Sequence, residues 1–185
     1  GDAIEFLREH EAMSFSEALV YIAGRYHITV KTGESDPQYT EAEKRRDSIF
    51  AVLHWARQQF SANLSENTQA LAYLRERKFD ASIEIFNIGY AGAGNDLMQK
   101  AHRSGYSDEL LLLAGLLKKN DRGHLYDTFS RRIIFPFFDR SGRVIGFTGR
   151  LITVEKDKPK YLNSPETEVF KKSRFLYGLY QSKKE

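Results

Sequence analysis

The chain has 185 residues, enough for one domain with a sizeable core and a small appendage. Its composition of 41% hydrophobic, 13% aromatic and 29% charged residues is typical of a globular protein, and no apolar run reaches the length of a membrane span. The lack of cysteine excludes disulfides and thiolate metal sites but says little about the compartment. A cytoplasmic location is the default expectation.

Charge is distributed unevenly along the chain. Residues 131–185 hold 13 Lys or Arg against 6 Asp or Glu, a balance of +7, whereas residues 1–130 have a balance of −4. A basic third attached to a mildly acidic body indicates a polyanionic partner. A solvated surface with uneven charges explains the same count equally well.

The first segment predicts two helices within residues 2–27. Asp2 can cap the first helix, and the sequence SFSE at residues 14–17 has capping-box spacing before the second. The polar, breaker-rich stretch that follows predicts a linker. The expected organisation is therefore a helical piece, a linker and a main domain, at residues 1–30, 31–39 and 40–185.

Helical periodicity dominates the first half of the main domain. A long helix is predicted from about residue 40 to 62, with these side chains facing inward: Ile49, Val52, Leu53, Ala56 and Phe60. A second helix is predicted over about 65–77, with a buried stripe formed by Asn67, Ala70, Leu71 and Leu74.

Two more helices are predicted after a glycine-rich turn at residues 89–94. Asn95 or Asp96 is expected to cap a short helix that runs through Ala101. A further helix is predicted over 107–120, because acids at its start and Lys118 and Lys119 at its end complement the helix dipole.

Two apolar runs around the Gly-containing turn 139–142 predict a β-hairpin. Pro136 cannot donate to a ladder, so the first strand is expected to be an edge there or to pair on one side only. Gly146 and Gly149 predict a bulge or the close approach of another backbone. Arg150 follows at the end of the second strand, where a fixed backbone can aim its guanidinium at a phosphate.

Cations alternate with aromatic residues in the last part of the chain, in the segments 156–161 and 170–177. Cations can follow phosphates while ring faces stack on bases, which favours a single-stranded nucleic acid, although the aromatics also suit a hydrophobic core. Helices followed by strands predict an α+β fold, with a helical N-terminal part and a small antiparallel or mixed sheet that carries a basic face.

Several long strings resemble one family. IIFPFFDRSGRVIGFTGR at 133–150 and PKYLNSPETEVFKKSRFLYGLY at 159–180 resemble the N-terminal subdomain of the RNA polymerase core of bacterial DNA primases of the DnaG type. AYLRERKFD at 72–80 and YDTFSRR at 126–132 extend the resemblance over nearly the whole chain. It implies the template-binding part of a DNA-directed RNA polymerase, a nucleotidyltransferase that makes short RNA primers on single-stranded DNA within the primosome.

The same resemblance implies DNA- or nucleotide-binding roles for six residues: Arg77, Arg150, Lys160, Tyr161, Asn163 and Lys172. Arg150 and Lys160 match positions expected to contact the template backbone, and Lys172 one expected to contact the initiating nucleotide or a nearby phosphate. Lys78 stands where the family usually has glycine. Since no carboxylates cluster in the way that two-metal catalysis requires, no catalytic or metal-binding residue is expected in this sequence.

The resemblance also implies cofactors and partners for a longer parent protein. Magnesium would belong to a Toprim domain that follows a YGLY motif such as residues 177–180, and zinc to a ribbon preceding a start like that at Gly1. The present piece is therefore expected to bind single-stranded DNA without cofactor and to be inactive alone. For the parent, the resemblance implies three partners: nucleoside triphosphates, the RNA primer and a replicative helicase. It implies no contact with a membrane.

Two alternatives remain open from the sequence. The segment could act as an interaction scaffold that docks the zinc and Toprim domains, in which case the basic stretch would face an acidic protein surface. It could also be the equivalent part of a phage- or plasmid-type primase.

Overall fold

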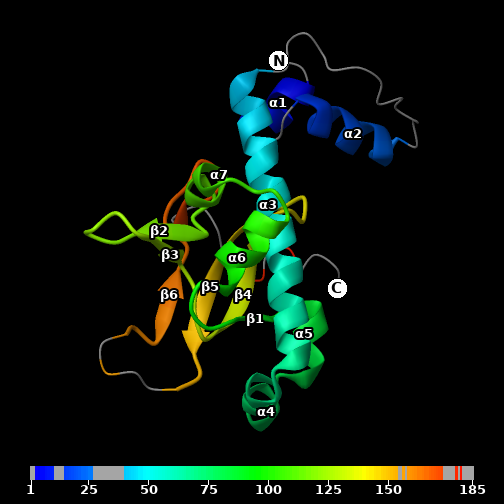
Figure 1. The fold of residues 1–185 in the computed structure, drawn as a ribbon. Helices are drawn as coiled ribbons and strands as arrows, with labels where there is room; N and C mark the ends of the chain where they lie inside the picture. Colours follow the sequence, from blue (N-terminus) through cyan, green and yellow to red (C-terminus); the bar gives the residue numbers. More distant parts are fainter. Residues whose placement is uncertain are drawn as a thin grey trace. The chain divides into compact units, whose positions relative to one another are not determined.

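The computed structural model describes residues 3–10, 15–26, 40–153, 156, 158–172, 178 and 180. The chain divides into two compact units, residues 1–45 and 46–185. In the first unit, α1 (Ala3–His10) and α2 (Phe15–Arg25) confirm the two helices predicted there (Figure 1). The predicted linker at 31–39 lies outside the described residues, so the expected three-part organisation stays a prediction.

Helix α3 (Glu41–Glu66) confirms the long predicted helix and continues beyond its predicted end. It begins with a capping box, because Thr40 Oγ1 accepts a hydrogen bond from the Glu43 N–H while the Glu43 carboxylate accepts one from the Thr40 N–H. The side chains predicted to face inward are all buried: Ile49, Val52, Leu53, Ala56 and Phe60. Neither α3 nor any other helix in the described ranges is long and apolar enough to cross a bilayer.

An antiparallel sheet of β1 (Gly89–Ala91), β4 (Arg132–Phe138), β5 (Val144–Leu151) and β6 (Tyr161–Asn163) lies beside α3 in the order β1-β4-β5-β6. The pair β4–β5 is the predicted hairpin. β1 pairs with β4 only as far as Ile134, so Pro136 pairs with β5 alone, as expected. The register shifts between Phe137 and Phe138, opposite Gly146, which confirms the predicted bulge.

The two faces of the sheet pack against different helices. On one face, Ile134, Phe147 and Leu162 join a core shared with α3 and α6 (Asp96–Arg103), and the rings of Phe60 and Phe147 meet edge to face at 5.2 Å (Figure 1). On the other face, Ile133 packs in a smaller core with Ala70 and Leu74 of α4 (Thr68–Glu76). The helices and this antiparallel sheet confirm the α+β prediction.

Helix α4 corrects one predicted role and explains an unusual residue. Asn67 caps the helix, with its Oδ1 accepting a hydrogen bond from the Ala70 N–H at 2.8 Å, instead of belonging to the buried stripe. After the helix, Lys78 adopts a left-handed backbone with φ of 60°. The Lys78 N–H donates to the Arg75 carbonyl at 2.9 Å, which closes the turn before the short helix α5 (Asp80–Ile85).

The helix predicted over 107–120 is wrong in its second half. Helix α7 (Asp108–Leu113) ends early, and Gly115, with φ of 70°, turns the chain into strand β2 (Leu117–Lys119). This strand pairs with β3 (Leu125–Asp127) in a separate two-stranded sheet. Lys118 and Lys119 are therefore hairpin residues, and the helix-dipole interpretation of these two lysines does not hold.

The cap of α6 comes from a distant part of the chain. Asn95 occupies the cap position without a side-chain bond to the helix, whereas the Asp127 carboxylate accepts hydrogen bonds from the N–H groups of Leu97 and Met98 at 2.9 and 3.0 Å. Burial raises the pKa of Asp127 to about 6, although both N–H donors favour the ionised form, and the nearby charge of Asp96 adds to the rise. Strand β3 is thereby tied to the start of α6.

Replacing Lys78 by glycine is expected to raise the free energy of unfolding by about 0.5–1 kcal/mol. A left-handed backbone costs an L-residue about 1–2 kcal/mol, and the greater freedom of glycine in the unfolded chain offsets part of the gain. Urea denaturation of Lys78→Gly and Lys78→Ala measures the effect. Alanine keeps the Cβ and should give no gain, so equal stabilisation by both would contradict the explanation.

The raised pKa of Asp127 predicts a pH-dependent stability. The pKa of its carboxyl is about 6 in the folded chain, against an ordinary value of 3.8, so the folded chain binds this proton more tightly than the unfolded chain does. Its contribution to the free energy of unfolding is therefore fully present below about pH 4 and lost as the pH rises through about 6. Denaturation across this window should show the stability of the wild type falling relative to Asp127→Asn, with the exposed Asp121→Asn as control. If the difference in free energy of unfolding between the wild type and Asp127→Asn stayed constant with pH, the raised pKa of Asp127 would be refuted.

Candidate nucleic-acid interface

Three of the six predicted site residues meet around a tyrosine that the sequence analysis did not single out. Tyr73 of α4 lies under two guanidinium groups, with Arg77 Cζ 4.9 Å and Arg150 Cζ 5.6 Å from its ring centroid. Arg150 also lies 5.2 Å from the ring centroid of Tyr161, and its Nη1 donates a hydrogen bond to the Tyr161 hydroxyl. We call these four residues, Tyr73, Arg77, Arg150 and Tyr161, the arginine–tyrosine cluster.

Strand register places the β-sheet half of this cluster. Arg150 of β5 is the direct partner of Tyr161 in β6, and antiparallel partners project from the same face of a sheet. Thr148 and Asn163 are the next pair on this face, so the predicted residue Asn163 lies two residues along β6 from Tyr161 and projects from the same face. Tyr161 is 52% exposed and Asn163 is also exposed, which leaves this part of the face open to a ligand.

Arg132 fixes the backbone on which the cluster is built. This arginine is only 3% exposed, and its Nη1 donates to the carbonyl of Gly149 at 3.2 Å and to that of Lys160 at 3.4 Å. The Lys160 carbonyl also accepts a hydrogen bond from the Leu151 N–H at 3.0 Å. The end of β5 and the start of β6 are therefore joined immediately beside Arg150 and Tyr161, and the exposed Lys160 side chain starts from a fixed backbone.

Gly149 makes room for this arrangement. A Cβ at this position would lie 2.8 Å from Phe129 Cδ1 and 2.9 Å from Arg132 Cδ, closer than real Cβ contacts allow. The prediction named the close approach of another backbone, whereas the atoms nearest to Gly149 belong to the side chains of Phe129 and Arg132.

Lys172 follows the strands of the sheet in the chain and lies apart from the cluster. It is exposed, and its backbone N–H donates to Glu166 at 3.3 Å. Two residues earlier, Phe170 packs on Phe137 with ring centroids 5.1 Å apart and lies against Gly146. Gly146 precedes Arg150 by four residues, or about 13 Å of strand. The structure therefore groups the other five predicted residues more closely than it groups Lys172.

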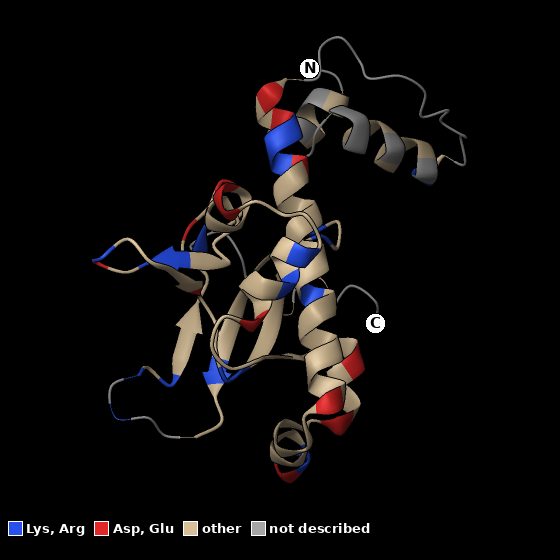
Figure 2. Cartoon of the chain, viewed as in Figure 1, with Lys and Arg blue, Asp and Glu red and all other residues tan. Residues whose placement is uncertain are grey.

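The charge around the cluster is positive. Exposed Lys156, Lys158 and Lys160 belong to the loop between β5 and β6, and Figure 2 shows blue along the described part of this loop and at the end of β5. Guanidinium and ammonium groups bind phosphate through charge-assisted hydrogen bonds, and exposed tyrosine rings can stack on bases. The arrangement suits a negatively charged, unpaired nucleic acid strand.

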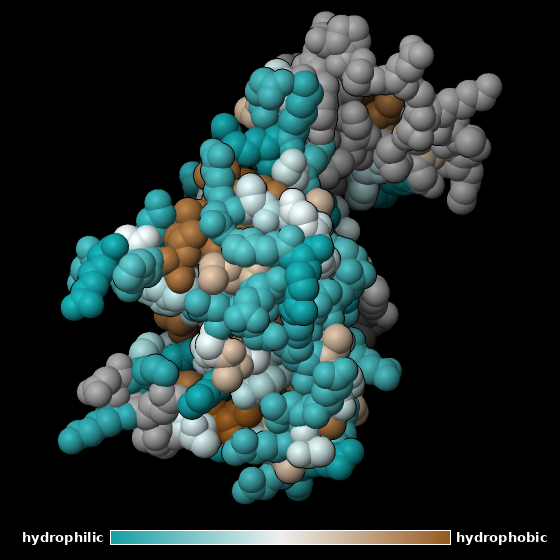
Figure 3. Space-filling model, in the orientation of Figure 1, coloured by the Kyte–Doolittle hydropathy of each residue, from teal (hydrophilic) through white to brown (hydrophobic). Residues whose placement is uncertain are grey.

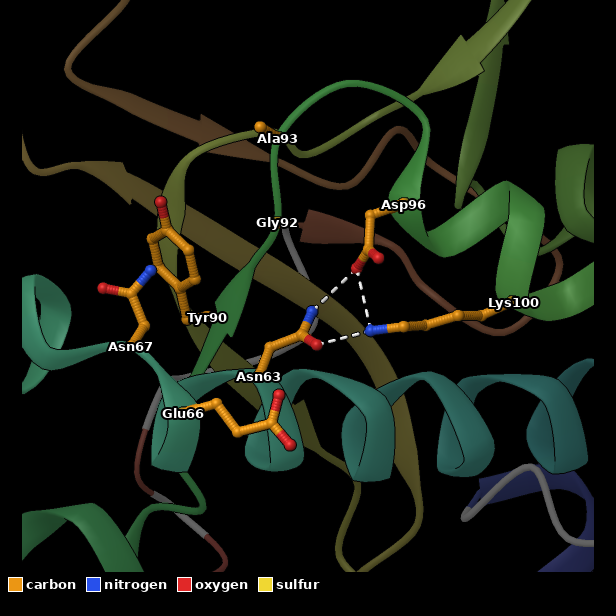
Figure 4. A pocket seen from close by; sticks show the side chains of 8 residues that line it. All are labelled: Asn63, Glu66, Asn67, Tyr90, Gly92, Ala93, Asp96 and Lys100. Carbon is orange, nitrogen blue, oxygen red and sulfur yellow. Dashed lines mark hydrogen bonds and ion pairs between the residues drawn. The ribbon is translucent and has the colours of Figure 1, made fainter.

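A second feature, at the opposite edge of the sheet, has different chemistry. A pocket of about 300 Å³ is lined by Asn63, Glu66, Asn67, Tyr90, Gly92, Ala93, Asp96 and Lys100 (Figure 4). Its lysine is already paired, because Lys100 Nζ lies 3.1 Å from the Asp96 carboxylate and donates to Asn63 Oδ1. The Asn63 amide in turn donates to Asp96 at 2.9 Å. Asp96 offsets the charge of Lys100 and Glu66 adds a further acid, so this pocket offers little attraction for a polyanion.

No group of three or more His, Cys, Asp or Glu side chains within the described ranges is placed to hold a metal ion. Asp139, at the opposite end of the β4–β5 hairpin from Arg150, closes the turn by accepting hydrogen bonds from the N–H groups of Ser141 and Arg143, each at 2.9 Å.

Comparison with known proteins gives one consistent family. The profile of the DNA primase catalytic core, N-terminal domain, matches residues 58–183. A DNA primase from Clostridium acetobutylicum is 36% identical over 181 residues, which cover 97% of this chain and 30% of that primase. The chain thus spans about a third of the length of the curated relatives it matches.

Solved structures agree in fold. The DnaG primase catalytic domain bound to single-stranded DNA superposes with a TM-score of 0.68 at 36% identity, over 76% of this chain and 46% of that one. The Aquifex aeolicus primase structure, described as zinc-binding and RNA polymerase domains, superposes with a TM-score of 0.67 at 32% identity, over 97% of this chain and 42% of that one.

Replacing the buried Arg132 by methionine is expected to lower the free energy of unfolding by about 1–3 kcal/mol, because two backbone carbonyls lose a donor that water cannot replace. The exposed Arg103→Met should change stability by less than about 0.5 kcal/mol. Chemical denaturation of both variants measures the difference. If Arg132→Met were as stable as the wild type, the guanidinium would not be the group that joins β5 to β6.

Proposed function

We propose, on the premise that this chain belongs to the family of the N-terminal domain of the DNA primase catalytic core, that its arginine–tyrosine cluster binds the single-stranded DNA template of a primase. A structural relative with a TM-score of 0.68 is a DnaG catalytic domain bound to single-stranded DNA, which supports this choice of ligand. The parent protein would synthesise short RNA primers on that template.

The convergence of Arg77 and Arg150 on Tyr73 carries the proposal. Two guanidinium groups from elements that are distant in sequence, α4 and β5, lie over one ring at 4.9 and 5.6 Å. Both guanidinium groups hold a positive charge beside the same ring, so an anion bound there is attracted by both. A phosphate group is such an anion and accepts hydrogen bonds from the planar fork of each arginine.

The remaining predicted residues extend the binding surface. Lys160 and Arg150 would contact the template backbone, since both start from the part of the sheet that Arg132 fixes. Tyr161 and Asn163 project from the same exposed face and would contact bases or sugars. Lys172, farther along the chain, would contact the initiating nucleotide or a nearby phosphate.

The chemistry of primer synthesis would belong to other parts of the parent protein. Magnesium would be held by a Toprim domain and zinc by a zinc-binding domain, and the Aquifex relative described with a zinc-binding domain supports the second assignment. Nucleoside triphosphates and a replicative helicase would be the parent's further partners. Residues 1–30 and 31–39 would be the tail of the zinc-binding module and a linker, leading into the core subdomain at 40–185.

Binding of a fluorescent single-stranded oligonucleotide tests the proposal. Arg150→Ala and Lys160→Ala are each expected to weaken binding about 3- to 10-fold regardless of sequence, and to reduce the slope of log Kobs against log salt by about 0.7. Arg103→Ala removes one exposed positive charge elsewhere and should leave the slope nearly unchanged. Thermal melting of each variant separates loss of binding from loss of folding.

Two results would count against template binding. One is an unchanged affinity and salt slope in folded Arg150→Ala and Lys160→Ala. The other is weak binding by the wild type that does not distinguish single-stranded from double-stranded DNA, which would favour the scaffold alternative.

A further inference from the structure

The β2–β3 hairpin is a second concentration of positive charge. It carries Lys118, Lys119 and Arg122 against two acids, Asp121 near the tip and Asp127 at the base, and the Asp127 carboxylate is buried at the start of α6. Lys119 and Arg122 are exposed, and no side chain of the three has a hydrogen-bond or ion-pair partner among the described residues. The hairpin projects from the body in Figure 1, its β2 strand is blue in Figure 2, and its tip is hydrophilic in Figure 3.

The tip of this hairpin is held in one conformation. Asn120 Oδ1 accepts hydrogen bonds from the N–H groups of Arg122 and His124 at 3.0 and 2.9 Å, and the Asn120 N–H donates to the His124 carbonyl at 3.0 Å. Gly123 completes the turn with a φ of 79°. A turn fixed by its own backbone loses little conformational entropy when it binds, which distinguishes it from a mobile solvated loop.

The base of the hairpin is anchored equally well. The Thr128 N–H donates to the Leu116 carbonyl at 2.8 Å, which extends the pairing beyond the strands. Asp127, the last residue of β3, caps α6 through two hydrogen bonds. The cations are therefore carried on a short arm that is continuous with the core.

An exposed aromatic ring accompanies these cations. Lys118 and Tyr126 are direct partners across the two strands, so their side chains project from the same face of the hairpin. Tyr126 is 40% exposed. A cation beside an exposed ring suits an unpaired nucleic acid strand, because the cation can bind a phosphate and the ring can stack on a base. An acidic protein surface would need only the cation.

The hairpin continues the proposed template surface beyond the end of β6. Its start is packed beside the end of β6, because a Cβ at Gly115 would lie 2.8 Å from Pro165 Cγ, two residues after Asn163. Strand β6 is an edge of the sheet and has three residues, about 10 Å. In Figure 3 the hairpin and the described part of the β5–β6 loop project on the same side, with an indentation between them.

We infer that the β2–β3 hairpin is a second phosphate-binding arm, which contacts the same single-stranded DNA beyond the arginine–tyrosine cluster after the strand has passed along β6. The inference rests on the proposed template binding and adds to it a second contact and a length requirement. A strand too short to extend past β6 binds only at the cluster, whereas a longer strand binds at both places.

Two oligonucleotide lengths test this arm, for instance about 3 and about 20 nucleotides, because at about 3.4 Å or more per nucleotide only the shorter one stays within the roughly 10 Å of β6. The triple variant Lys118→Gln, Lys119→Gln, Arg122→Gln is expected to bind the long strand about 10-fold or more weakly at low salt, with a salt slope reduced by about 2. Its affinity for the short strand should equal that of the wild type. Arg150→Ala, in contrast, should weaken binding of both lengths.

A charge-matched control separates contact from long-range attraction. Lys44→Gln, Arg45→Gln, Arg103→Gln removes the same net charge outside the hairpin, and it should retain most of the affinity for the long strand. Equal losses in both triple variants, or an unchanged affinity of the hairpin variant for the long strand, would overturn the inference and assign the hairpin to solvent or to a protein partner. If the wild type bound neither length, the proposed function itself would fail, and the inference with it.

Discussion

The buried guanidinium of Arg132 is the interaction on which the geometry of the proposed template surface depends. It lies at the first residue of β4 and reaches the carbonyls of Gly149 and Lys160, at 3.2 and 3.4 Å. A charged group that is 97% buried needs such acceptors, because desolvation without them costs several kcal/mol. The same bonds hold the two strand ends from which Arg150 and Lys160 project. The missing side chain at Gly149 is what permits the guanidinium to reach this place.

Helix α4 adds the other half of the cluster by an independent route. Its Ala70 and Leu74 are buried against Ile133 of the sheet, so apolar packing sets the position of the helix. Tyr73 is adjacent to Leu74 and is partly buried in the same core, which brings its ring to the edge of the contact, within reach of Arg150. Arg77 follows Tyr73 by one helical turn and lies over the same ring. The cluster is therefore assembled by core packing on one side and by the Arg132 hydrogen bonds on the other.

The sequence predicts the parts of this fold whose signals are local. The stripe of α3 and the β4–β5 hairpin follow from periodicity and from a Gly-containing turn, and both are found. The helix predicted over 107–120 fails because leucines on both sides of Gly115 hide the break, and a left-handed glycine ends the helix there. The cap of α6 could not be predicted, since Asp127 lies about 30 residues away in the chain. Tyr73 was detectable, because its spacing of four from Arg77 in a predicted helix places both on one face.

Net charge along the sequence is a poor guide to where a polyanion would bind on this molecule. The basic segment 131–185 supplies Arg150 and Lys160, but Arg77 and the hairpin cations Lys118, Lys119 and Arg122 come from the segment with a balance of −4. In both places the cations project from a fixed backbone and lie near a partly exposed tyrosine, Tyr161 in one and Tyr126 in the other. A fixed position increases the contribution of each cation to the binding free energy, because a preorganised cation loses little entropy when it binds phosphate. A mobile surface lysine loses more. Placement of a few cations, more than their number, therefore decides which surface of this domain can bind a nucleic acid strand.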